Sequence, residues 1–150
     1  MALRADKPDY RPALPRGPYG DVKYGRTADG TEHAWEFWQN RMNSQARSAF
    51  GTLFRMITST RGLQIFNRRK FKQVEGDLYE FKSNAHQMRI FCFRRGDTWY
   101  LTSGLEGKKE DDLPQGAVQR ALEIMWHCDA ELKLFENERR AREDKDRRKR

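Results

Sequence analysis

The sequence predicts an α+β fold, in which an N-terminal helix or helical hairpin and a C-terminal helix pack on a small antiparallel β-sheet. Three observations lead to this prediction. Apolar residues recur at helical spacing over residues 33–60, three short aromatic segments follow within 78–103, and a second helical pattern begins after Pro114. Helices that flank a run of hairpin-connected strands are typical of the α+β class.

The first helical pattern starts near Thr31, which is a plausible N-cap, and Gly62 is well placed to end it. Gly51 lies inside the pattern and is expected to divide it into two pieces. Apolar residues widen the stripe beyond one face, so this helix is expected to be buried on two sides. The spaced residues are Trp35, Trp38, Met42, Ala46, Ala49, Leu53 and Ile57.

Three short segments, 78–82, 88–94 and 98–103, are rich in aromatic and β-branched residues and are expected to form strands. Arg95-Gly96-Asp97 between the last two is a tight-turn pattern, and residues 83–87 close the other hairpin. Together the segments predict an antiparallel meander. Residues 105–112 are expected to form a polar loop before the last helix.

The ends of the chain differ in composition from the middle. Residues 1–31 hold four of the five prolines and are expected to form a flexible, solvated arm, with docking through Tyr10, Tyr19 and Tyr24 as the alternative. The folded domain is expected to span 32–136. The charged tail, 137–150, is expected either to add non-specific affinity for RNA or ribosomes or to extend the last helix as a solubilising segment.

Charge and composition bear on partners. The 150-residue chain has a formal net charge of +8, and 35% of its residues are charged. A positive excess favours nucleic acid, an anionic membrane or an acidic protein as partner. No apolar run approaches the roughly 20 residues that cross a bilayer. Cys92 and Cys128 lie in apolar stretches of a chain without an apparent secretory signal, so reduced core thiols and a cytoplasmic location are expected.

The order of the motifs resembles the HigB-like, phage-derived arm of the RelE/ParE toxin superfamily. That family shows a "lyElr" strand, a "yRilyf" strand, a "vvlLhgFkKK" strand and loop, a proline and a final helix. Here these read LYEFK, MRIFCF and WYLTSGLEGKK, followed by Pro114 and AVQRALEIM. The preceding helical segment and GLQIFNRRKFKQVEG also resemble the family, so the resemblance covers roughly residues 33–135.

The resemblance implies a ribosome-dependent endoribonuclease toxin that cleaves mRNA by attack of a 2′-hydroxyl on the adjacent phosphate, without cofactor or metal. It implies a cognate antitoxin of the helix-turn-helix type as a second partner besides the ribosome. Cationic donors stabilise the charge that such a phosphate gains in its transition state. Two alternatives stay open: a non-catalytic nucleic-acid- or protein-binding member, such as a phage accessory protein, and a toxin directed at DNA gyrase.

The matching positions carry the expected roles. Arg89 is expected to stabilise the transition state, with an ion pair to Glu80 as the alternative interpretation, and Lys82 to contact a flanking phosphate. Ser103 replaces the histidine of the "hgF" motif, so His86 is the candidate general base. An open sheet face is expected to present the cations, and either Trp99 or Tyr100 is expected to stack on a base. The expected RNA-binding residues are Lys108, Lys109, Arg94, Arg95 and Trp99.

Overall fold

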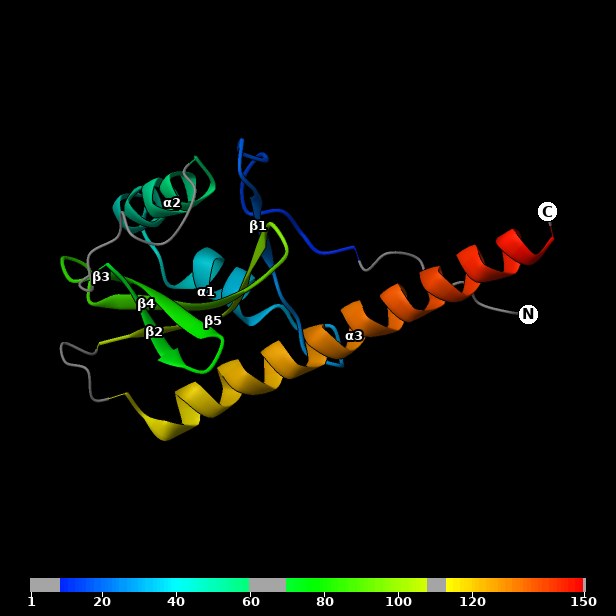
Figure 1. Ribbon diagram of the computed structural model, residues 1–150. Helices are drawn as coiled ribbons and strands as arrows, with labels where there is room; N and C mark the ends of the chain where they lie inside the picture. The colour runs from blue at the N-terminus through cyan, green and yellow to red at the C-terminus, as the bar shows by residue number, and fades with distance from the viewer. Residues whose placement is uncertain (1–8, 60–69, 108–112, 150) are drawn as a thin grey trace.

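The computed structural model describes residues 9–59, 70–107 and 113–149. Within them, five strands form one sheet in the order β1-β5-β4-β3-β2, with helices on both of its faces (Figure 1). The strands are β1 (Asp21–Tyr24), β2 (Phe71–Glu75), β3 (Leu78–Ser83), β4 (Met88–Arg95) and β5 (Thr98–Glu106). The helices are α1 (His33–Asn40), α2 (Ser44–Ser59) and α3 (Gln115–Arg148). The predicted α+β class is confirmed.

Strands β2 to β5 follow one another as an antiparallel meander. Gly76 and Gly96 occupy the tight turns after β2 and β4 with positive φ angles of 54° and 60°, a conformation that glycine adopts without steric cost. The register places Lys82 directly opposite Arg89. Hairpin positions predicted from the turn residues are therefore confirmed, and β2 adds a strand that the sequence did not suggest.

Strand β1 lies within the segment that was expected to be a flexible arm. It pairs in parallel with the first half of β5, from Asp21 opposite Thr98 to Tyr24 opposite Leu101. The side chains of Val22 and Tyr24 are 0% and 2% exposed, so the short strand contributes to the core by simple alternation. Four residues are too few for this pattern to stand out among glycines and prolines.

The residues ahead of β1 are also docked. Tyr10 is 2% exposed, and its ring packs edge-on against Tyr100 with 5.1 Å between centroids. The guanidinium of Arg26 lies over the same tyrosine ring and forms an ion pair with Glu131 of α3 at 2.7 Å. Tyr19, in contrast, remains exposed. Tyr10 and Tyr24 are therefore docked, as the alternative prediction stated, and burial of their aromatic rings stabilises this segment on the domain.

The first helical segment breaks at residues 41–43, whereas Gly51 lies inside the continuous α2 helix. The Asn43 side-chain oxygen accepts a hydrogen bond from the Ala46 backbone N–H at 2.8 Å, which is the geometry of an N-cap. The Arg47 guanidinium donates to the backbone oxygens of Trp38 and Gln39, both at 3.0 Å. The backbone groups left free at the end of α1 and at the start of α2 are thus hydrogen-bonded at this junction, which favours a break there. Gly51 costs the continuous α2 helix only a modest amount of stability.

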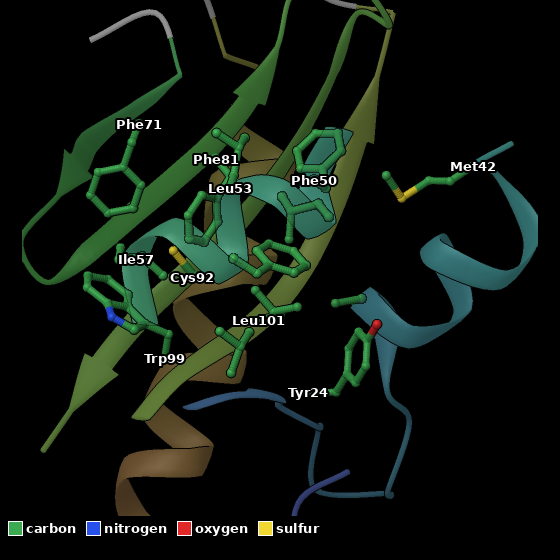
Figure 2. Close-up of a cluster of buried hydrophobic side chains, with 14 of the residues drawn as sticks. Tyr24, Met42, Phe50, Leu53, Ile57, Phe71, Phe81, Cys92, Trp99 and Leu101 are labelled. Carbon is green, nitrogen blue, oxygen red and sulfur yellow. The ribbon is translucent and has the colours of Figure 1, made fainter. Parts of the chain in front are cut away.

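Both faces of the sheet are covered, which corrects the expectation of an open face. Residues of one strand parity pack against α1 and α2, and Figure 2 shows Phe81, Trp99 and Leu101 gathered there with Leu53 and Ile57 of α2. Residues of the other parity pack under α3. Strand β4 illustrates the reason, because it is apolar at both parities: Ile90 and Cys92 on the α2 side, Phe91 and Phe93 on the α3 side.

Helix α3 has 34 residues and is therefore about 51 Å long. Its buried residues all fall between Val118 and Cys128, and the later turns project beyond the sheet (Figure 1). The segment expected as a charged tail continues this helix, with ion pairs of helical spacing from Glu136 to Arg139 and Arg140. None of the described helices is long and apolar enough to cross a membrane.

Candidate functional site

The predicted site residues separate toward the two ends of the sheet. Lys82, His86 and Arg89 lie near the β3–β4 turn, whereas Arg94 and Arg95 lie at the far end of β4. Arg89 and Arg95 are six residue steps apart along the extended strand, a distance of about 20 Å. Lys108 and Lys109 lie outside the described residues. The chain therefore does not bring all the predicted cations to one surface patch.

Arg89 is a buried structural residue in this conformation. Its side chain is 1% exposed and donates through one terminal nitrogen to both carboxylate oxygens of Glu80, at 2.8 and 3.1 Å. Glu80 is 0% exposed and also lies 3.7 Å from the Lys72 ammonium. The ion-pair interpretation therefore describes Arg89. Contact with a phosphate is excluded here, because the pair is enclosed between the sheet and its covering elements.

The two arginines at the far end of β4 have different surroundings. Arg95 donates to both carboxylate oxygens of Asp129 on α3 at 2.6 Å, and lies 3.3 Å from Asp77. Such a bidentate pair leaves little of the guanidinium for a ligand. Arg94 is exposed, donates to the Gly96 backbone oxygen at 2.9 Å, and keeps an outward face for a phosphate. Of the two, Arg94 is the better placed for RNA.

Neither aromatic candidate of β5 can stack on a base in this conformation. Trp99 is 3% exposed and lies edge-on to Phe71 at 5.4 Å between centroids. Tyr100 is 6% exposed and stacks with Phe93 on the opposite face of the sheet. Alternation places one ring in each core, and both faces are covered. The expected base-stacking role of Trp99 is therefore not supported, because its ring is buried against Phe71 on the α2 side of the sheet.

His86 lies in the turn between β3 and β4, where Ser83 holds its ring. The Ser83 hydroxyl oxygen and the His86 Nδ1 are 2.9 Å apart, and which of them donates depends on the tautomer. The turn is closed by a hydrogen bond from the Gln87 N–H to the Asn84 oxygen, and Gln87 has a positive φ of 52°. A histidine oriented through one ring nitrogen has the other available for proton transfer.

A pocket of about 530 Å³ opens beside this histidine, between α2 and the β3–β4 turn. Its helix wall is formed by Ala49, Thr52, Leu53 and Met56. Lys70 and Lys82 line it together with residues 83–86. Ser83, Lys70 and the α2 residues were not predicted as site residues. The signal available for α2 was an apolar stripe wider than one face, and Met56 is indeed 37% exposed.

Ser103, which replaces the histidine of the "hgF" motif, does not line the pocket beside His86. Ser103 is 4% exposed and lines a pocket of about 300 Å³ that also borders His33 and Arg120. No hydrogen bond between these side chains brings them together as a dyad in the described structure. Over residues 9–59, 70–107 and 113–149, no three His, Cys, Asp or Glu side chains gather closely enough to hold a metal ion.

The two cysteines are buried thiols, 0% exposed each, on opposite faces of the sheet. Burial raises the pKa of both, most strongly for Cys92, where the Glu80 carboxylate adds to the effect. A raised pKa favours the unreactive protonated form.

In native buffer at pH 8, both thiols are therefore expected to react with iodoacetamide at least about tenfold more slowly than in denaturant. Mass spectrometry of the alkylated chain provides the measurement. The free energy of unfolding should also fall as the pH rises above 9, because the unfolded thiols ionise near 9.0 and the folded ones do not. Rapid native alkylation of either cysteine would contradict the buried placement.

Comparisons with known proteins show no family for this chain. No protein-family model matches the chain, and no curated protein matches it.

Proposed function

We propose that this protein is an endoribonuclease of the toxin type that cleaves mRNA on the ribosome, with its reactive centre at the β3–β4 turn. The observation that carries the proposal is the oriented His86, held by Ser83 at the rim of a pocket that Lys70 and Lys82 also line. The motif order, the confirmed fold class and the net charge of +8 support it further. A cognate antitoxin is the expected second partner.

In the proposed reaction His86 acts as the general base. It removes the proton of the 2′-hydroxyl as that oxygen forms a bond to phosphorus, and the bond from phosphorus to the 5′-oxygen breaks. The products are a 2′,3′-cyclic phosphate and a 5′-hydroxyl, whose oxygen takes its proton from solvent. Lys82 and Lys70 stabilise the charge on the phosphate, so the role first assigned to Arg89 passes to lysines. The need for a 2′-hydroxyl restricts the substrate to RNA.

The variant His86→Gln is expected to lose about 100- to 10,000-fold of the cleavage rate, the usual contribution of a general base. The measurement is cleavage of a defined mRNA in a translation extract, read by primer extension and by detection of the cyclic phosphate end. His127→Gln, the same chemical change on α3 and outside the pocket, is the matched control and should cleave at the wild-type rate. Cleavage by His86→Gln at the wild-type rate would exclude His86 as the base.

A second candidate function is a non-catalytic binding protein on the same scaffold. The specific observation in its favour is that Arg89, the matching family arginine, is enclosed in an ion pair with Glu80. In that case the wild-type protein would leave the transcript intact while still binding RNA or an acidic protein. Binding to RNA whose affinity falls steeply with salt, without cleavage, would favour this candidate over the nuclease.

A further inference from the structure

Strand β5 is longer than the strand that covers its outer edge. β1 pairs with residues 98–101, and no described strand lies beside residues 102–106 on that side. The N-terminal segment leaves the edge at Gly25, whose backbone N–H donates to the Leu101 carbonyl at 2.7 Å. Among the described residues, the second half of β5 is therefore an open edge of the sheet.

The hydrogen-bond pattern of the β4–β5 hairpin identifies the backbone groups on this edge. The Gly107 N–H donates to the Gln87 carbonyl at 2.9 Å. In an antiparallel ladder, such hydrogen-bonded pairs alternate with pairs whose backbone groups point away from the partner strand. In the register with β4, Glu106 and Gly104 fall in the outward-pointing pairs. Their N–H and C=O groups face the open edge, where no described residue hydrogen-bonds to them.

A pocket of about 300 Å³ lies against the same edge. Ser103 and Gly104 border it, together with Arg120 of α3 and four residues of α1: His33, Glu36, Phe37 and Asn40. Helices α1 and α3 cover opposite faces of the sheet (Figure 1), so a pocket that both helices border must pass around the edge of β5. Gly104 is partly exposed and Glu106 is exposed, so the edge can be reached from solvent.

The chemistry of the edge favours an extended peptide as its occupant. A small anion would accept from an N–H but would leave the outward carbonyls without a donor, whereas a peptide backbone supplies both groups. The pocket itself holds both signs of charge, Arg41 and Arg120 against Glu36, so the charge of the whole chain decides the preference. A net charge of +8 attracts an acidic partner and repels a second copy.

We propose that residues 102–106 of β5 bind an extended segment of an acidic partner protein, which adds to the sheet as a further strand. The backbone of the segment pairs with Gly104 and Glu106, and one of its side chains enters the pocket between α1 and α3. Main-chain hydrogen bonds then supply affinity, and the pocket supplies specificity. This binding surface does not depend on whether the protein cleaves RNA.

Amide hydrogen exchange of the free protein tests the edge itself. After correction for intrinsic rates, the amides of Gly104 and Glu106 are expected to exchange at least about tenfold faster than that of Leu105, whose N–H points toward β4. Equal protection of the three amides would show that the edge is closed and would overturn the proposal.

Peptide binding tests the occupant. Peptides of about eight residues are selected from a displayed random library and then measured on the full chain by NMR and calorimetry. The selected peptides are expected to be acidic and to protect the Gly104 and Glu106 amides. N-methylation at alternate peptide residues should weaken binding at least about tenfold in one parity and little in the other. Failure to select a peptide, protection elsewhere on the chain, or no dependence on parity would overturn the proposal.

A variant of the protein provides the reciprocal test. Glu106→Pro removes an N–H that does not bond to β4, so the ladder is retained, and peptide binding should weaken at least about tenfold. Glu106→Gln keeps the N–H and is the matched control, with an affinity within about twofold of wild type. Wild-type affinity of folded Glu106→Pro would overturn the proposal, and if that variant does not fold, the N-methylated peptides decide. Dimerisation that protects the same amides would assign the edge to a second copy and would also overturn it.

Discussion

The variant Arg89→Ala is expected to lower the free energy of unfolding by about 3–5 kcal/mol, because it leaves the Glu80 carboxylate buried without its closest partner. Lys72, at 3.7 Å, compensates only in part. For a chain of this length, the loss corresponds to a fall in Tm of roughly 10–15 °C. Denaturant titration and calorimetry measure both quantities. Arg89→Ala by itself is therefore a poor test of catalysis, since its inactivity could follow from unfolding.

Two further variants isolate the pair. The double variant Glu80→Leu/Arg89→Met replaces the buried charges with apolar groups of similar size and should recover most of the lost stability. Arg140→Ala, at a mostly exposed position, should change the free energy of unfolding by less than about 0.5 kcal/mol. If Arg89→Ala is as stable as Arg140→Ala, the burial of the ion pair is wrong, and Arg89 returns as a candidate for phosphate contact.

The variant Phe81→Ala is expected to cost about 3–5 kcal/mol, through lost burial and the cavity that remains. Phe81 is 0% exposed and touches rings from three elements: Phe54 of α2 and Phe71 of β2, each at 5.0 Å, and Trp99 of β5 at 6.5 Å between centroids. Figure 2 shows its ring at the centre of this cluster. Partial collapse is difficult because the surrounding rings are large and already in contact.

Urea denaturation followed by tryptophan fluorescence measures this loss, since Trp99 lies within the same cluster. Phe81→Leu retains most of the buried volume and should cost markedly less than Phe81→Ala. Leu134→Ala on the projecting part of α3, where the side chain is 57% exposed, should be near neutral. An equally small loss for Phe81→Ala and Leu134→Ala would show that the ring cluster is not the centre of the core.

Much of the fold could be predicted because local patterns determine it. The strands β3, β4 and β5 have aromatic sequences and glycine turns between them, so both their existence and their antiparallel pairing follow. Strand β1 could not be predicted, because its four residues become a strand only through pairing with β5, 77 positions later. The break before α2 depends on Asn43, whose capping role competes with an unbroken apolar stripe.

The candidate site could be predicted only in part. The residue types were identified, but their exposure depends on which elements cover each face of the sheet. Once α3 covers the face opposite α2, Arg89 becomes an interior group. Trp99 is enclosed on the α2 side. His86 was identified because it is a titratable residue in a turn, yet its link to Ser83 and the nearby pocket required three-dimensional packing.

Strand β1 has a consequence for how the molecule behaves among its copies. The backbone of Thr98–Leu101 in β5 would otherwise present unsatisfied N–H and C=O groups along a sheet edge, which invites pairing with a strand of another chain. Further along β5, the ring of Phe37 on α1 lies against Gly104, so closely that an added Cβ would be 2.3 Å from it, and it covers the face of the sheet there. The segment before residue 31 thus covers this edge of β5, and the net charge of +8 adds electrostatic repulsion between copies as a second obstacle to strand pairing there.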